Sequence, residues 1–222
     1  MMNVLFCAYR RWALDAWFEL QGTDPNLNIT SVSSEDQFFK KIKDLQHIDV
    51  ILLVGWSWII PEDIVRKYNV ICYHPSDLPN FAGGSPIQHQ ILEGIEETNA
   101  TLFKVTPQID QGPIILKTHI SLRGNMSDIF KELTRSSIEL VGEYLHRFPN
   151  IVPKQQNELH KTKKRLKPSH SKLEKNKLSN KTCKELYNFI RCKEDPYPNA
   201  FIEDGTGKLF FKLVEFVENE KV

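Results

Sequence analysis

The sequence predicts an α/β fold with a doubly wound, mainly parallel β-sheet. Three apolar runs of strand length, Met2–Ala8, Asp49–Gly55 and Val70–Tyr73, are separated by stretches with helical periodicity. Parallel strands are buried on both faces and read as apolar runs, and their alternation with helices predicts a sheet covered on both sides. The 222 residues suffice for one sizeable core and a small appendage.

The helices expected between and after these strands are marked by caps and prolines. Ser34, followed three residues later by Gln37, matches a capping box. Ser127 is expected to cap the longest helix, and Pro61 and Pro86 stand at the starts of two others. Together with apolar periodicity, these signals predict helices over 11–20, 34–45, 61–68, 85–94 and 127–148, and further strands over 101–105 and 113–120.

The character of the chain changes after residue 148. Residues 161–181 contain nine basic residues and one acid, which indicates a solvated, mobile surface segment. A short helix is expected over 182–191, and strands over 200–203 and 208–217 are joined by Asp204–Gly207, a hairpin signal. Because an isolated hairpin is marginal in water, we expect it to pack on the main domain, on a partner subunit, or on both.

Composition excludes several classes of protein. A net charge of +1 gives no support for a general nucleic-acid binder, and no apolar run approaches the length of a membrane span. The N-terminal stretch lacks a signal-peptide pattern, so we expect a cytoplasmic protein. The cysteines show no paired spacing and no metal-ligand spacing with histidine, which predicts free thiols and no metal site at Cys7, Cys72, Cys183 and Cys192.

His74 occupies the most informative position in the chain. Ligands of such sheets bind beyond the carboxyl ends of the strands, and His74 directly follows the third predicted strand. The loop after it contains Pro75 and Pro79, which stiffen the backbone, and Gly83–Gly84, which let backbone approach a ligand closely. A lone histidine is usually structural, but this setting favours proton transfer at neutral pH.

A second candidate loop, Asp110–Pro113, lies between the last two predicted strands of the sheet. Aspartate and glycine favour reverse turns, so this segment taken alone indicates only a turn. It becomes a candidate site only in combination with the other motifs of the chain.

Several motifs, in order, resemble those of the folate-dependent formyltransferase family. The pattern appears as Cys72-x-His74, Ser76-x-Leu78-Pro79, Gly83–Gly84 and Asp110-x-Gly112. Gly55–Pro61 resembles the family loop that cradles the pterin. The segments Lys163–Ser169 and Pro196–Phe201 resemble the region that leads into the C-terminal portion of the tRNA and sugar enzymes, so the resemblance covers nearly the whole chain.

The resemblance implies roles for named residues, with 10-formyltetrahydrofolate as the cosubstrate. His74 would exchange protons with the attacking amine, and Asp110 would hold its tautomer and stabilise its charged form. The implied cofactor-binding residues are Trp56, Ser57, Trp58, Ile59, Asp110 and Gly112. The implied substrate-binding residues are Tyr9, Arg10, Ser76, Gly83, Gly84 and Gln88.

Cys72 departs from the family pattern, which has an asparagine that donates to the formyl oxygen. A thiol is a weak donor, and losing one oxyanion donor can cost about 3–4 kcal/mol. Either another donor replaces it, or catalysis relies on protonated His74, or the chain is not a catalyst. We expect Cys72 to belong to an active centre, and a nucleophilic Cys72 ranks low because direct transfer needs no covalent intermediate.

The resemblance implies a Rossmann-like catalytic domain over 1–150, a basic linker over 151–181 and a C-terminal helix with β-hairpin over 182–222. The acceptor it implies is a dTDP- or UDP-linked amino sugar, for surface glycan, O-antigen or lipopolysaccharide synthesis by a homodimer. Only about forty residues follow Thr182, fewer than the barrel of methionyl-tRNA formyltransferases needs. The alternatives are a tRNA-directed enzyme lacking that barrel and a non-catalytic folate- or sugar-binding module.

Overall fold

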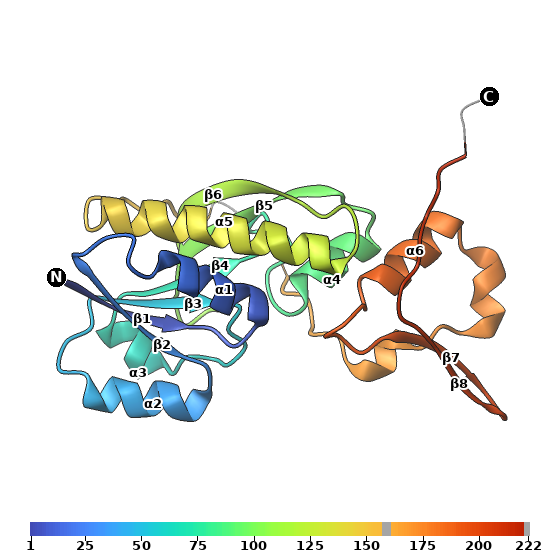
Figure 1. Ribbon diagram of the computed structural model, residues 1–222, viewed down its shortest axis with the longest axis horizontal. Coiled ribbons are helices and arrows are strands. Elements are labelled where there is room, and N and C mark those ends of the chain that lie inside the picture. The colour runs from blue at the N-terminus through green and yellow to red at the C-terminus, as the bar shows by residue number, and fades with distance from the viewer. Residues whose placement is uncertain (157–160, 220–222) are drawn as a thin grey trace.

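The sheet predicted from the apolar runs is present and has six strands. The computed structural model describes residues 1–156 and 161–219. The strand order is β2-β1-β3-β4-β5-β6, with parallel pairing from β2 to β4 and antiparallel pairing at β5 and β6 (Figure 1). The strands are β1 (Met2–Cys7), β2 (Leu27–Val32), β3 (Val50–Val54), β4 (Val70–His74), β5 (Glu97–Lys104) and β6 (Ile114–Ser121).

Helices cover both faces, which confirms the doubly wound prediction. One face carries α1 (Arg11–Leu20) and α5 (Met126–Arg147), and the other carries α2 (Glu35–Asp44) and α3 (Glu62–Lys67) (Figure 1). Strand β1 shows how the sequence serves both layers: Val4 and Phe6 pack in the core under α1 and α5, whereas Leu5 and Cys7 pack in the core under α2 and α3. Successive side chains of a strand point to opposite faces, so consecutive residues in the buried part of such a strand are apolar.

Strand β2 is the one strand of the sheet that the sequence did not predict. Its residues Asn28, Thr30 and Ser31 interrupt any apolar run, and β2 lies at the edge of the sheet, where it pairs only with β1. An edge strand needs less burial than a central one, so its composition gives a weak signal.

The helix caps were predicted with mixed success. Ser34 accepts a hydrogen bond from the backbone of Gln37, as the capping box predicts. The prediction that Ser127 caps the long helix is wrong, because Asn125 is the N-cap and forms a reciprocal capping box with Asp128. Two good capping residues stand two positions apart here, and side-chain type alone does not choose between them.

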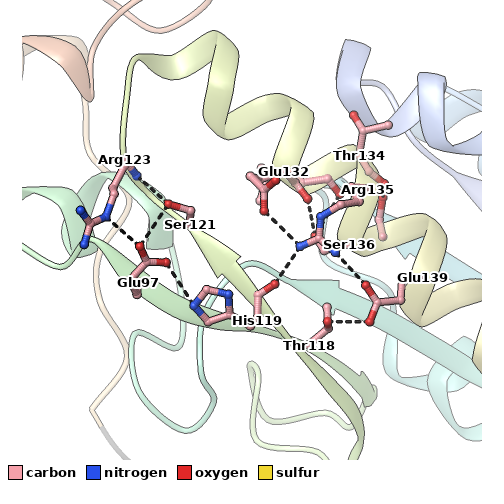
Figure 2. Close-up of polar contacts among 12 residues, drawn as sticks. Glu97, Thr118, His119, Ser121, Arg123, Glu132, Thr134, Arg135, Ser136 and Glu139 are labelled. Carbon is pink, nitrogen blue, oxygen red and sulfur yellow. Dashed lines mark hydrogen bonds and ion pairs between the residues drawn. The ribbon is translucent and has the colours of Figure 1, made fainter.

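Polar side chains tie the antiparallel edge of the sheet to α5. Arg123 and His119 both contact Glu97, and Arg135 of α5 donates to the backbone oxygen of His119 and to the carboxylate of Glu132 (Figure 2). Exposed pairs of this kind contribute about 0–1 kcal/mol each. They add little to the packing of α5 on the sheet, which the buried core already stabilises.

The C-terminal module, residues 183–211, consists of α6 (Cys183–Arg191) and the hairpin β7 (Ala200–Asp204) with β8 (Gly207–Phe211). Both the helix and the hairpin were predicted, although β8 ends earlier than expected. Two 3₁₀ turns, Pro168–Ser171 and Lys175–Asn180, precede the module. The division of the chain at residues 150 and 181 stays a prediction. No helix in the described ranges has both the length and the apolar character that crossing a membrane requires.

Candidate active site

A cavity of about 660 Å³ opens beyond the carboxyl ends of the parallel strands. It lies where the strand order and the loop after β4 predict a ligand site. The structure brings most of the predicted site residues into its wall: Arg10, Trp56, Ser57, Trp58, Ile59, Cys72, His74, Gly83, Gly84, Gln88 and Asp110.

His74 stands at the end of β4, and its imidazole is buried, with 8% of the side chain exposed. Its Nε2 lies 3.0 Å from the backbone oxygen of Phe81. Because a carbonyl oxygen can only accept, Nε2 must carry the proton of this hydrogen bond. In neutral His74 the nitrogen left with a lone pair is therefore Nδ1.

Asp110 faces that second nitrogen. Its Oδ2 lies 3.6 Å from Nδ1 of His74 and accepts a hydrogen bond of 2.7 Å from the backbone N–H of Gly83. A separation of 3.6 Å is too long for a direct hydrogen bond. Our expectation that Asp110 fixes the tautomer is therefore wrong in this state, because the carbonyl of Phe81 does so. Asp110 remains placed to stabilise a proton arriving on Nδ1.

Cys72 shares the cavity wall with His74, as residues two apart on one strand should. Burial raises the pKa of the Cys72 thiol, and the negative charge of Asp110 raises it further. The sulfur therefore stays protonated at neutral pH. A protonated thiol is a poor nucleophile but retains a weak S–H donor.

An aromatic cluster forms one end of the cavity. The rings of Trp56 and Trp58 lie 4.6 Å apart, and Tyr9 packs edge-on against Trp58 at 4.8 Å. The hydroxyls of Tyr9 and Ser57 are 2.6 Å apart. Tyr9 thus supports the loop from behind and does not itself line the cavity, contrary to our expectation of substrate contact. Ile59 is 78% exposed at the rim.

Two further predicted residues, Ser76 and Gly112, also lie outside the wall. The hydroxyl of Ser76 is fully buried and donates to the backbone oxygen of Asn80 at 2.8 Å. At Gly112 an added Cβ would stand 1.7 Å from the backbone oxygen of Lys104. Both residues shape the loops that carry the site, and the ligand contacts that we expected of them stay predictions.

Part of the basic segment that we expected to be solvated instead forms the cavity wall. Lys163 pairs in parallel with Gly83: its N–H donates to Ala82 and its oxygen accepts from Gly84, at 2.7 and 2.9 Å. An added Cβ on Gly84 would lie 2.6 Å from Cα of Arg165, so the glycine permits this close approach. Composition could not reveal this contact, because main-chain pairing is largely independent of side-chain type.

The loop that starts at Pro196 forms another part of the cavity wall. Tyr197 lines the cavity, and the guanidinium of Arg10 lies over its ring at 5.5 Å. Burial raises the pKa of Tyr197, while Arg10 and a hydrogen bond with Gln88 oppose that shift. Tyr197 was not predicted as a site residue, although it stands in a motif that the sequence singled out.

The comparisons with known proteins agree with this geometry. A family model described as "Formyl transferase" matches residues 20–139. This match covers more than half of the chain, and the chain belongs to that family. Its members use 10-formyltetrahydrofolate as formyl donor.

Individual relatives differ in the acceptors that their names state. A methionyl-tRNA formyltransferase from Ehrlichia ruminantium is 34% identical over 122 residues, which are 53% of this chain and 40% of that protein. The chain thus spans well under half the length of this relative. The solved methionyl-tRNA formyltransferase from Clostridium thermocellum is 29% identical, with a TM-score of 0.88, and the match covers 100% of this chain and 96% of that chain.

The fold is also shared with sugar enzymes. A sugar N-formyltransferase from a Shewanella species is 17% identical, with a TM-score of 0.72, and the match covers 98% of this chain and 100% of that chain. At this identity the likeness extends to the fold alone.

Proposed function

We propose that this chain is an N-formyltransferase that moves a formyl group from 10-formyltetrahydrofolate to a primary amine. The observation that carries the proposal is the convergence of His74 and Asp110 in one cavity, from loops 36 residues apart. An imidazole beside a carboxylate is suited to general acid–base chemistry, which typically contributes about 10²–10⁴ in rate.

His74 acts on the proton of the attacking amine. The neutral amine forms the new C–N bond, and Nδ1 of His74 accepts the proton that the amine gives up. The carboxylate of Asp110 stabilises the imidazolium that results. Nδ1 then returns the proton to the departing nitrogen of the donor, whose bond to the formyl carbon breaks, so that charge and atoms balance.

The aromatic end of the cavity fits the donor. Bound 10-formyltetrahydrofolate would supply an activated formyl group on the nitrogen that links its pterin to its benzoyl ring. Trp56, Trp58 and Ile59 provide apolar surface for such a ring system. The indole nitrogen of Trp56 is buried and has no hydrogen-bond partner among the described residues.

For the acceptor, we propose an amino sugar linked to a nucleotide. Gln88, Tyr197 and the segment that contains Arg165 form part of the cavity wall, which suits a small molecule. Arg10 and Arg165 also line the cavity, and the guanidinium of Arg10 lies over the rings of Tyr9 and Tyr197. The positive charge of these two groups favours an acceptor with phosphate groups.

A second candidate acceptor is methionyl-tRNA. The observation that favours it is the identity of 34% to a methionyl-tRNA formyltransferase, which exceeds the 17% to a sugar enzyme. The phosphates of an RNA would meet the same arginines, and binding would then weaken steeply with salt.

One experiment separates these functions. The purified chain is incubated with 10-formyltetrahydrofolate and either dTDP- and UDP-linked amino sugars or methionyl-tRNA, and formyl addition is followed by mass spectrometry. We expect a mass increase on a nucleotide-linked sugar. Transfer only to methionyl-tRNA would select the second candidate, and donor binding without transfer to any acceptor would indicate a non-catalytic module.

We also propose a cytoplasmic homodimer that forms through the hairpin. Leu209, Phe210 and Leu213 expose 59%, 50% and 75% of their surface on or next to β8, so the two-stranded sheet presents apolar side chains to its surroundings. Light scattering should give the mass of two chains for the native protein and of one chain for Phe210→Glu. A monomeric native protein would contradict the proposal.

A further inference from the structure

Asp110 reaches His74 through an unusual backbone conformation. Its φ is 55°, in the left-handed region that non-glycine residues rarely adopt. Such a conformation costs about 1–3 kcal/mol and persists only where surrounding contacts impose it. The loop between β5 and β6 therefore needs an external anchor to keep the carboxylate beside the imidazole.

Gln156 provides that anchor. Its Nε2 donates to the backbone oxygen of Asp110 at 2.9 Å and to that of Gly112 at 2.8 Å. Only the amide nitrogen can donate to two carbonyls at once, so the orientation of the side chain is determined. Its Oε1 is buried and lacks a partner among the described residues, which costs desolvation free energy. The two hydrogen bonds that Nε2 donates offset this cost.

The backbone brings Gln156 to this place independently of the active site. After α5 the chain returns along β6, where Lys154 and Ile114 exchange two backbone hydrogen bonds of 2.7 Å. Gln156 follows two residues later and lies beside the loop that precedes β6. It does not belong to the cavity wall, and both of its hydrogen bonds go to the loop of Asp110, so an influence on catalysis passes through that loop.

We propose that Gln156 is a positioning residue for formyl transfer. By holding the carbonyls on either side of Gln111, it maintains the left-handed backbone of Asp110 and so the position of the carboxylate near Nδ1 of His74. The inference rests on the proposed function, since it assigns Gln156 to the machinery of that same reaction.

Kinetics of three variants test the proposal. Gln156→Leu should lower kcat by about 10- to 100-fold, since a misplacement of about 1 Å can cost about 100-fold. The exposed neighbour provides the matched control, and Gln155→Leu should leave kcat unchanged. In an Asp110→Asn background, Gln156→Leu should change kcat less than about twofold, because its only route is already removed. Independent, multiplicative losses would show a merely structural role and overturn the proposal.

A measurement without turnover keeps the two proposals distinguishable. In long-range ¹H–¹⁵N NMR spectra, Gln156→Leu and Asp110→Asn should shift the Nδ1 resonance of His74 in the same direction, whereas Gln155→Leu should not. Should Gln156→Leu fail to fold, Gln156→Glu replaces it, since a carboxylate of similar size cannot donate to the two carbonyls. An unshifted Nδ1 resonance overturns the positioning role even if formyl transfer is found. A shifted resonance in a protein that transfers no formyl group contradicts the proposed function alone.

Discussion

In the active-site loops, residues 75–85 and 105–113, the polar groups are held by strained backbone. The non-glycine residues with left-handed φ in the described chain are Phe81, Ser85 and Asp110, and all three lie in these loops. Each such residue costs about 1–3 kcal/mol. The loops therefore depend on hydrogen bonds from other segments, such as those that Lys163 makes to Ala82 and Gly84.

The C-terminal module uses a different means. Within its described residues no non-glycine backbone is left-handed, but Arg191, Lys193 and Glu194 are at least 95% buried. Arg191 donates to the backbone oxygens of Leu122 and Gly124 at 2.7 and 2.9 Å, which attaches α6 to the chain before α5. The comparison suggests a division: changes in the loops should affect activity, and changes in the module should affect stability.

The largest effect is expected at His74. His74→Ala should lower the rate of formyl transfer by about 10²–10⁴-fold, because the base is removed. The free energy of unfolding should fall by about 1–3 kcal/mol, because the carbonyl of Phe81 loses its donor, so activity is compared per folded molecule. His119→Ala is the matched control, because His119 has 66% of its side chain exposed at the sheet edge. Full activity of His74→Ala would show that our assignment of the site is wrong.

Next in size is the effect of breaking the attachment of α6. Arg191→Met should lower the free energy of unfolding by about 2–4 kcal/mol, because two buried carbonyls lose their donor. Urea unfolding measures this loss, and kcat per folded molecule should be unchanged. Lys184→Met, in the same helix but 38% exposed, should cost less than about 1 kcal/mol. Equal losses in the two variants would contradict the division between loops and module.

A gain is expected at Cys72. Cys72→Asn should raise kcat by about tenfold, because an amide replaces a weak thiol donor near the formyl oxygen. Cys72→Ala should leave kcat within about threefold of the native value. If Cys72→Ala instead abolished transfer, the thiol itself would take part in the chemistry and the direct-transfer mechanism would fail.

The smallest effect is a pH dependence within the module. Burial raises the pKa of Glu194, although its hydrogen bond from the backbone of Met126 opposes the shift. The pKa of a glutamate in the unfolded chain is about 4.3. Between this pKa and the raised pKa of Glu194 in the folded protein, the folded protein binds more protons than the unfolded chain. Stability from this group therefore increases as the pH falls through that window.

Glu194→Gln tests this sign. The amide oxygen can still accept from Met126 but does not titrate. The variant should be at least as stable as the native protein at pH 7. Between pH 7 and pH 5, the free energy of unfolding of the native protein should increase relative to that of the variant. Urea unfolding of both proteins at each pH gives the difference, in which other groups cancel. If the free energy of unfolding of the native protein instead decreased relative to the variant as the pH fell, the direction of the Glu194 pKa shift would be wrong.

How much the sequence could predict varies with the kind of contact. The position of His74 followed from strand patterns, because the carboxyl ends of parallel strands meet at one edge. Asp110 was identified only through the family resemblance, since β5, which precedes its loop, runs antiparallel to β4. The Lys163–Gly83 pairing and the anchor at Gln156 had no signal, since backbone hydrogen bonds to a loop require no special composition. The loop contacts of Ser76 and Gly112 were not predicted, because a motif shows which residues are needed, and not whether they contact a ligand or shape a loop.

The hydrogen bond from Nε2 of His74 to Phe81 limits how protons can travel in the site. With one ring nitrogen committed to a buried carbonyl, the imidazole cannot relay protons from one side to the other. Nδ1 therefore has to accept the proton and return it, and the ring does not conduct protons between the substrate and solvent. Each turnover can then be completed without passing that proton through the ring to bulk water.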